Sequence, residues 1–152
     1  MAREPKLVVV IDTREQRPWS FSAEVSTVRA ALPAGDYSVQ GLEDRIRIER
    51  KELGDFVNCC TWARERFLRE LEKLRKVELR AIVVEASLLD VAAHTYRSKA
   101  TPKAIVASAV AFHIDYGVPV IWAGDHEKAA RIGEMMLRRF ARKARETNVE
   151  VR

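Results

Sequence analysis

The chain has 152 residues, of which 47% are hydrophobic and 32% are charged, as expected for one globular domain with its own core and not for a disordered chain. No apolar run is long enough to span a membrane or to form the core of a signal peptide. We therefore expect a cytoplasmic protein, or a nuclear one if the source is eukaryotic. The net charge of +5 favours a polyanionic partner, although an Arg-rich composition is equally typical of a GC-rich genome.

Strand-like patterns dominate the first third of the chain. A continuous β-branched run ends in Asp12, which predicts a buried strand. An irregular stretch follows it, and a turn at residues 33–35 leads into a hairpin around residues 41–44. The predicted strands of this part are residues 6–12, 27–32, 36–40 and 45–51.

Helices and strands alternate in the rest of the chain. Thr101 and Pro102 predict the start of a helix that runs to about residue 113, and Asp125 predicts the cap of a final helix that runs to about residue 145. The other predicted elements are helices at residues 52–61 and 63–76 and strands at residues 80–86 and 118–123. The alternation indicates an α/β domain with a mixed sheet of five or six strands and helices on both faces.

The second strand of the hairpin carries the most informative charged residues. Because side chains alternate between the two faces of a strand, Ile46 and Ile48 are expected to point into a core. Glu49 and Lys51 then point together to the opposite face. Asp36 begins the partner strand and is expected opposite the end of this one, so that two carboxylates and an ammonium group converge.

Two further carboxylates are expected nearby. Asp12 ends the first strand, where functional residues of open α/β sheets usually lie, and Asp55 falls in the first turn of a helix, where the helix dipole favours a carboxylate. Carboxylates without His or Cys suit Mg²⁺ or Mn²⁺, which activates water toward a phosphodiester, and a lysine can offset the developing charge. Taken alone, these charges are also typical of a solvated hairpin.

A longer pattern distinguishes between these interpretations. Gly35-Asp36, Glu49-Arg50-Lys51 and Asp55 form Gly-Asp-x(n)-Glu-Arg-Lys-x(3)-Asp, which resembles the signature of the XPF family of structure-specific DNA endonucleases. Residues 11–15 (Ile-Asp-Thr-Arg-Glu) and 32–37 (Leu-Pro-Ala-Gly-Asp-Tyr) are similar to further family segments, as are residues 66–71, 81–85 and 116–120. The resemblance extends over about residues 6–143.

The resemblance implies a restriction-endonuclease-like α/β/α sandwich that cleaves branched, forked or flapped DNA in repair or recombination, with Mg²⁺ or Mn²⁺ as cofactor. It assigns metal binding to Asp12, Asp36 and Glu49, and catalysis to these three residues and Lys51. It assigns supporting positions in the same site to Arg14, Glu15, Arg50 and Asp55. Arg66, on the helix that follows the signature, matches a residue that contacts phosphate.

The chain also departs from the family pattern. Glu70 stands where the family helix commonly has Gln, and the added negative charge could weaken DNA contact. Family enzymes usually carry a tandem helix-hairpin-helix module, and some carry a helicase. This sequence contains neither, so we expect a single nuclease domain over residues 1–152, as a standalone protein or as a fragment. Family precedent predicts a homodimer through the C-terminal helices, and a heterodimer also fits. The final helix, whose apolar stripe includes Met135, Met136 and Phe140, is a candidate for the contact, although such a stripe is most often core.

Other candidate DNA contacts have two interpretations each. Arg17 lies beside Trp19 and Phe21, whose rings could stack on an unpaired base or cover the end of the sheet. Lys99 and Lys103 follow Arg97 in a basic segment that could bind phosphate or form a solvated loop. The leading hypothesis is a metal-dependent DNA endonuclease. The alternative is a catalytically silent DNA-binding subunit that partners an active nuclease, and the intact Glu-Arg-Lys-x(3)-Asp pattern favours the first.

Overall fold

Six strands form one mixed sheet at the centre of the protein. The computed structural model describes residues 5–150, with side chains through residue 147. The strands are β1 (Val8–Asp12), β2 (Ser26–Ala30), β3 (Tyr37–Val39), β4 (Ile46–Lys51), β5 (Leu79–Val84) and β6 (Val120–Trp122), in the order β2-β1-β3-β4-β5-β6. Only β3 runs antiparallel to its neighbours. The carboxyl ends of β1, β4 and β5 and the start of β3 therefore meet at one edge of the sheet.

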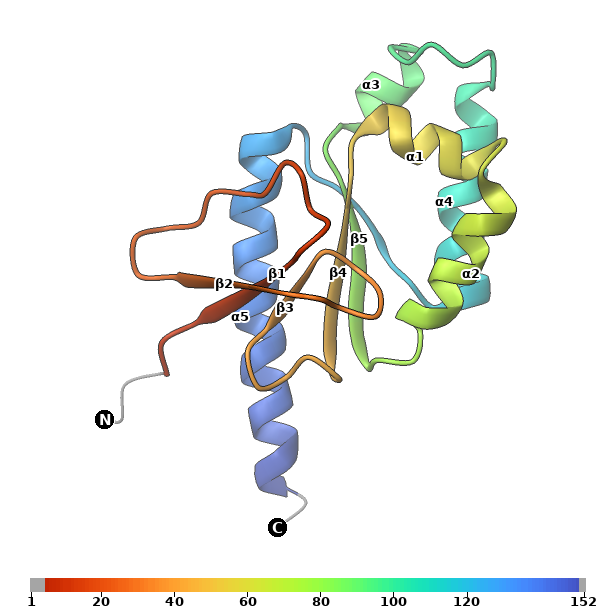
Figure 1. Cartoon of the computed structure of the whole chain (residues 1–152). Helices are drawn as coiled ribbons and strands as arrows, with labels where there is room; N and C mark the ends of the chain where they lie inside the picture. The colour runs from red at the N-terminus through yellow and green to blue at the C-terminus, as the bar shows by residue number, and fades with distance from the viewer. Residues whose placement is uncertain (1–4, 151–152) are drawn as a thin grey trace.

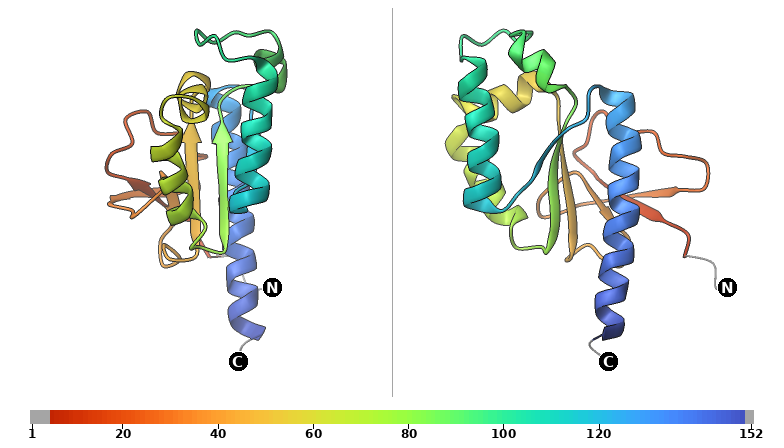
Figure 2. Two further views of the ribbon diagram at one scale, coloured as in Figure 1. Left: turned by 90° about the vertical axis from the view of Figure 1, so that its right-hand side faces the viewer. Right: turned by 180° about the vertical axis from the view of Figure 1, so that it is seen from behind.

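Helices cover both faces of this sheet. They are α1 (Leu53–Cys60), α2 (Arg64–Leu74), α3 (Leu88–Ala92), α4 (Pro102–Tyr116) and α5 (His126–Glu150). Figure 1 shows α5 on one side of β4 and β5, and α1, α2 and α4 on the other, and the view from behind in Figure 2 agrees. The expected α/β/α sandwich with a mixed central sheet is confirmed. None of the helices in the described part of the chain is long and apolar enough to cross a membrane.

The helix ends follow local chemistry. Thr101 caps α4 by accepting a hydrogen bond from the backbone of Ala104, and Gly117, at a φ of 66°, ends it. Asp125 accepts a hydrogen bond from the backbone of Lys128 at the start of α5. Both N-terminal caps agree with the sequence prediction. The sequence predicts ends near residues 113 and 145, but α4 continues to Tyr116, where Gly117 stops it, and α5 continues to Glu150.

One helix was not predicted. α3 has only five residues, and its N-terminal end is held by a reciprocal cap in which the side chains of Ser87 and Asp90 each accept a hydrogen bond from the other's backbone N–H group. A single turn is too short for a periodic apolar pattern, so only the cap could have indicated it. The segment between α3 and α4 forms one wall of a pocket described below.

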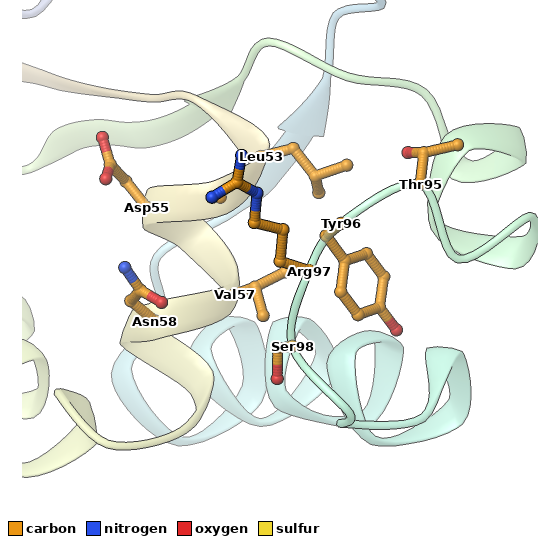
Figure 3. Close-up of a pocket in the computed structure, with 9 residues that line it drawn as sticks. Leu53, Asp55, Val57, Asn58, Thr95, Tyr96, Arg97 and Ser98 are labelled. Atoms are coloured by element: carbon orange, nitrogen blue, oxygen red, sulfur yellow. The ribbon is translucent and has the colours of Figure 1, made fainter.

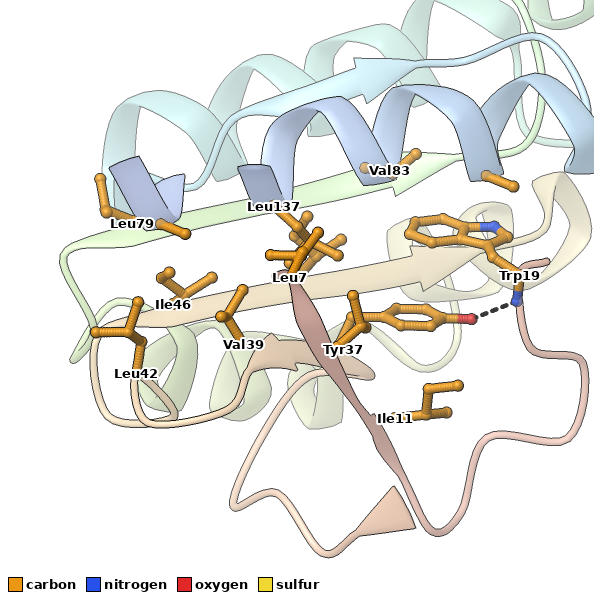
Figure 4. Close-up of a cluster of buried hydrophobic side chains, with 14 of the residues drawn as sticks. Leu7, Ile11, Trp19, Tyr37, Val39, Leu42, Ile46, Leu79, Val83 and Leu137 are labelled. Carbon is orange, nitrogen blue, oxygen red and sulfur yellow. Dashed lines mark hydrogen bonds between the residues drawn. The ribbon is translucent and has the colours of Figure 1, made fainter. Parts of the chain in front are cut away.

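Two apolar clusters hold the layers together. On the α5 face, Tyr37 stacks on Trp19 with ring centroids 4.4 Å apart, and its hydroxyl accepts a hydrogen bond from the Trp19 backbone at 2.8 Å (Figure 4). Gly133 of α5 lies against the same indole, because an added Cβ there would stand 2.3 Å from a Trp19 ring carbon. On the other face, Phe56, Phe67 and Phe112 pack edge to face.

Candidate active site

The four predicted catalytic residues gather at the edge where β1, β3 and β4 meet. They are Asp12, Asp36, Glu49 and Lys51. Their strand neighbours Ile11, Tyr37 and Ile48 pack into the cluster beneath α5, so by alternation the four side chains project to the face that α1 and α2 cover. The strand pairing expected from the sequence is present.

The turn before β3 sets the position of Asp36. Gly35 adopts a φ of 79°, which a glycine accommodates without strain and which turns the chain into β3. The backbone N–H of Asp36 then donates to the carbonyl of Ile48 at 2.8 Å, and its carbonyl accepts from Asp12 N at 2.8 Å. Asp36 is thereby pinned between the ends of β1 and β4.

Asp36 and Glu49 form an electrostatically strained pair. Burial raises the pKa of Asp36 to about 8, and the nearby charge of Glu49 adds to this effect. Burial also raises the pKa of Glu49, against the opposing attraction of Lys51, whose Nζ lies 3.5 Å from Glu49 Oε1. Two carboxylates that resist ionisation next to each other are a poor arrangement for stability and a suitable one for a divalent cation.

Lys51 stays charged in this setting. Burial would lower its pKa, but the charges of Glu49 and Asp36 outweigh burial and raise it. Its ammonium group also lies 5.4 Å from the ring centroid of Phe67, on α2. Lys51 is therefore a held cation beside the carboxylate pair, able to donate hydrogen bonds to a phosphate or to water.

Asp12 is engaged differently. Its side chain is buried and accepts hydrogen bonds from the backbone N–H of Leu32 at 2.8 Å and from Arg14 Nε at 2.9 Å. Burial alone would raise the pKa of Asp12, but these bonds outweigh burial and lower it. Within residues 5–147, no three His, Cys, Asp or Glu side chains form a group that could hold a metal ion. The carboxylate oxygens of Asp36 and Glu49 are the kind of ligand that a hard cation prefers. The carboxylate of Asp12 is instead hydrogen-bonded to Leu32 and Arg14 of its own chain.

The Arg of the signature faces the opposite side of the sheet. Arg50 donates two hydrogen bonds to Glu15, at 2.8 and 2.9 Å, and one to Glu85 at 2.6 Å. Glu85 follows β5 and also accepts from Trp19 Nε1 at 2.9 Å and contacts His126 Nδ1 at 2.5 Å. Arg50 therefore ties three distant segments together behind the site, and only its backbone N–H contacts Asp36, at 2.7 Å.

Glu85 and His126 were not among the predicted site residues. Glu85 directly follows the buried strand β5, where a charged residue at a strand end could have indicated a role. His126 gave no signal, because nothing local to it connects the start of α5 with β5.

Helices α1 and α2 supply the rim of the site. Arg66 is exposed on α2 and lies 5.7 Å from the ring centroid of the exposed Trp62. Glu70, on the same helix, lies near enough for its charge to raise the pKa values of Glu49 and Arg14. Asp55 is exposed in the first turn of α1. The departure noted at Glu70 therefore adds negative charge to the site itself.

The remaining predicted DNA contacts lie farther out. Arg17 is exposed and pairs with Glu52 at 2.8 Å. Lys99 and Lys103 are exposed in the segment before α4 and in its first turn. Trp19 is buried and Phe21 is half-buried against it. For Trp19, the interpretation that it covers the end of the sheet is therefore correct and the base-stacking interpretation is wrong.

A family model places this arrangement among known proteins. The model of the ERCC4 domain matches residues 11–136, which include every residue of the site. The chain belongs to the ERCC4 domain family. The resemblance to the XPF nuclease domain inferred from the sequence is thereby confirmed.

Solved structures support the same assignment for this ERCC4 domain. XPF from Aeropyrum pernix is 26% identical, with a TM-score of 0.67 over 86% of this chain and 60% of that one. The complex of XPF from Aeropyrum pernix with DNA is 24% identical, with a TM-score of 0.67 over 90% of this chain and 66% of that one, and shows the same fold.

A curated relative is much longer. MJ1505 of Methanocaldococcus jannaschii, named an ATP-dependent RNA helicase, is 27% identical over 123 residues, which are 80% of this chain and 14% of that protein. The ERCC4 domain described here thus spans a small part of this relative and less than two thirds of the matched XPF chains.

Proposed function

We propose that this ERCC4 domain is a metal-dependent endonuclease that hydrolyses phosphodiester bonds in branched, forked or flapped DNA during repair or recombination. The observation that carries the proposal is the convergence of Asp36, Glu49 and Lys51 at one sheet edge, on one face. The XPF structure from Aeropyrum pernix that contains DNA adds support from a protein of the same fold.

Each residue has a role that follows from its surroundings. Asp36 and Glu49 would hold Mg²⁺ or Mn²⁺, because their mutual repulsion is relieved by a cation. When bound, such a cation polarises the phosphate and lowers the pKa of water. Lys51, whose pKa is raised, is protonated at neutral pH. It therefore donates hydrogen bonds to the phosphate and offsets its developing negative charge, instead of accepting a proton.

The supporting residues position this machinery. Arg14 holds the carboxylate of Asp12 and is itself largely exposed, so it could exchange that contact for a DNA phosphate. Arg66, exposed on α2, is a second candidate phosphate contact. Arg17, Lys99 and Lys103 extend the basic surface beyond the site.

Cleavage of end-labelled DNA tests the proposal. Flap, splayed-arm and duplex substrates are incubated with Mg²⁺, with Mn²⁺ and with EDTA, using the wild type, Glu49→Gln and the control Glu72→Gln, which alters an exposed residue of α2. We expect metal-dependent cutting that falls at least about 100-fold in Glu49→Gln, with DNA binding retained and the control unchanged. Binding without cutting in either metal would instead identify a silent subunit.

We also propose that the domain forms a homodimer through α4. The sequence makes the final helix the candidate for this contact, but the apolar stripe of α5 packs into the domain's own core. Among the described residues, α4 instead carries an exposed apolar face. Val106, Val110 and Ile114 lie on successive turns and are 38%, 56% and 74% exposed. They line a groove of about 270 Å³ with Trp122 of the edge strand β6. Light scattering on the wild type and on Val110→Glu tests this, because a monomeric wild type would refute the homodimer.

A further inference from the structure

A pocket of about 400 Å³ lies between α1 and the segment that connects α3 with α4. One wall is the first two turns of α1, and the other is formed by residues 95–98 (Figure 3). The α1 wall begins two residues after Lys51, so the pocket adjoins the candidate active site. Its volume falls in the range of pockets that take small organic groups.

The far wall is built by interactions that hold its shape. Tyr96 is buried, stacks on His94 with ring centroids 4.2 Å apart, and donates its hydroxyl hydrogen to the carbonyl of Ala100 at 2.7 Å. His94 adopts a φ of 56°, uncommon for a residue with a side chain, and its Nε2 contacts the Ser98 carbonyl at 2.6 Å. The surrounding contacts therefore fix an otherwise unfavourable turn, which keeps the pocket open in advance of a ligand.

The lining combines three kinds of chemistry. Leu53, Val57 and the Tyr96 ring are apolar, and the Asn58 amide offers both a donor and an acceptor. Arg97 brings a positive charge (Figure 3), and its side chain makes no hydrogen bond or ion pair within the described residues. Asp55 is the one acidic residue of the lining, and it disfavours a phosphate on its own side. A ligand with a planar, partly polar body and one anionic group matches this lining.

We propose that this pocket binds a single unpaired nucleotide of the DNA strand next to the scissile phosphate. The proposal rests on the proposed function and extends it to the substrate. The base packs against the half-buried Leu53, and its edge bonds to the half-buried Asn58. Arg97 pairs with the phosphate. A nucleotide in a duplex cannot enter, because its base edge and its faces are already occupied, so the pocket selects substrates with an unpaired strand at the junction.

Binding measurements without a metal test the pocket separately from catalysis. Fluorescence anisotropy in EDTA compares flap DNA with fully paired duplex for the wild type, Arg97→Ala, Asn58→Ala and the control Lys103→Ala. Lys103 is a nearby exposed cation outside the pocket lining. We expect Arg97→Ala and Asn58→Ala to weaken flap binding about tenfold and to leave duplex binding within about twofold. Lys103→Ala should affect both DNAs alike.

A base analogue provides a second readout. 2-Aminopurine at the first unpaired position should change its emission on binding the wild type and not on binding Asn58→Ala. Equal losses on flap and duplex, or none, would overturn the pocket assignment, as would an unchanged 2-aminopurine signal. A protein that cuts no substrate but keeps an Arg97-dependent preference for flaps would refute the proposed nuclease and leave the pocket standing, and absence of any DNA binding would refute both.

Discussion

Replacing Arg50 with Ala is expected to destabilise the fold by about 3–5 kcal/mol, the usual cost of breaking a buried ion pair. The Arg50 side chain is 11% exposed, and its partners Glu15 and Glu85 are 4% and 3% exposed. Without Arg50, two nearly inaccessible carboxylates behind the active site lose the cation that they share. Glu85 keeps its contacts with Trp19 and His126, whereas Glu15 loses both side-chain hydrogen bonds from Arg50. For a domain of this length the loss corresponds to a fall in Tm of about 6–20 °C.

The loss of stability caused by Arg50→Ala should depend on pH in a definite direction. Burial alone would raise the pKa of Glu15, but hydrogen bonds from Arg50 and from the Arg17 backbone outweigh burial and lower it. Glu15 in the wild type therefore stabilises the fold above its unfolded pKa, and this contribution is lost as the pH falls through its lowered folded pKa. In Arg50→Ala, burial is less opposed and protonation becomes favourable. The gap in stability between wild type and variant should narrow as the solution is acidified.

Urea denaturation followed by circular dichroism measures the free energy of unfolding of both proteins at pH 7 and at about pH 5. Arg131→Ala is the matched control, because Arg131 pairs with Glu127 on the exposed surface of α5 and such pairs contribute less than about 1 kcal/mol. If Arg50→Ala costs no more than the control at pH 7, or if its cost grows on acidification, the buried network does not hold the site in the way described.

Three further predictions concern the site and its support. Asp36→Asn should raise the Tm of the metal-free protein above pH 8, because the raised pKa of Asp36 means that its ionisation destabilises the fold as the pH rises. The same substitution should abolish Mn²⁺ binding measured by calorimetry. A Tm below that of the wild type above pH 8 would contradict the prediction. Glu70→Gln removes a charge that raises the pKa of Glu49, so the pH dependence of Mn²⁺ binding should shift to lower pH. An unchanged titration would place Glu70 outside the site. Gly133→Ala should cost about 1–3 kcal/mol in urea denaturation, because its Cβ would clash with Trp19, and a Tm equal to that of the wild type would show that the indole moves freely.

Local sequence patterns were sufficient to predict which side chains meet at much of the catalytic edge of the sheet. The period of two along β4 places Glu49 and Lys51 on one face, and the hairpin brings Asp36 beside them, as the hydrogen bond between Asp36 N and the Ile48 carbonyl confirms. These features depend only on strand geometry and on a turn a few residues away, so the chain encodes them within a short segment. The long apolar pattern of α5 and its cap at Asp125 were predictable for the same reason.

Other features depended on contacts that no short segment encodes. The same alternation sends Arg50 to the opposite face, but its partners Glu15 and Glu85 come from segments 35 residues away on either side. Only the sheet order, with β1 and β5 both ending at the edge where β4 ends, brings them together. The bonds that hold Asp12 and the pocket between α1 and residues 95–98 also arise from tertiary packing. The sequence by itself determined which residues can share a face, and the tertiary structure decided which of those faces meet, because side-chain direction is local while strand order is not.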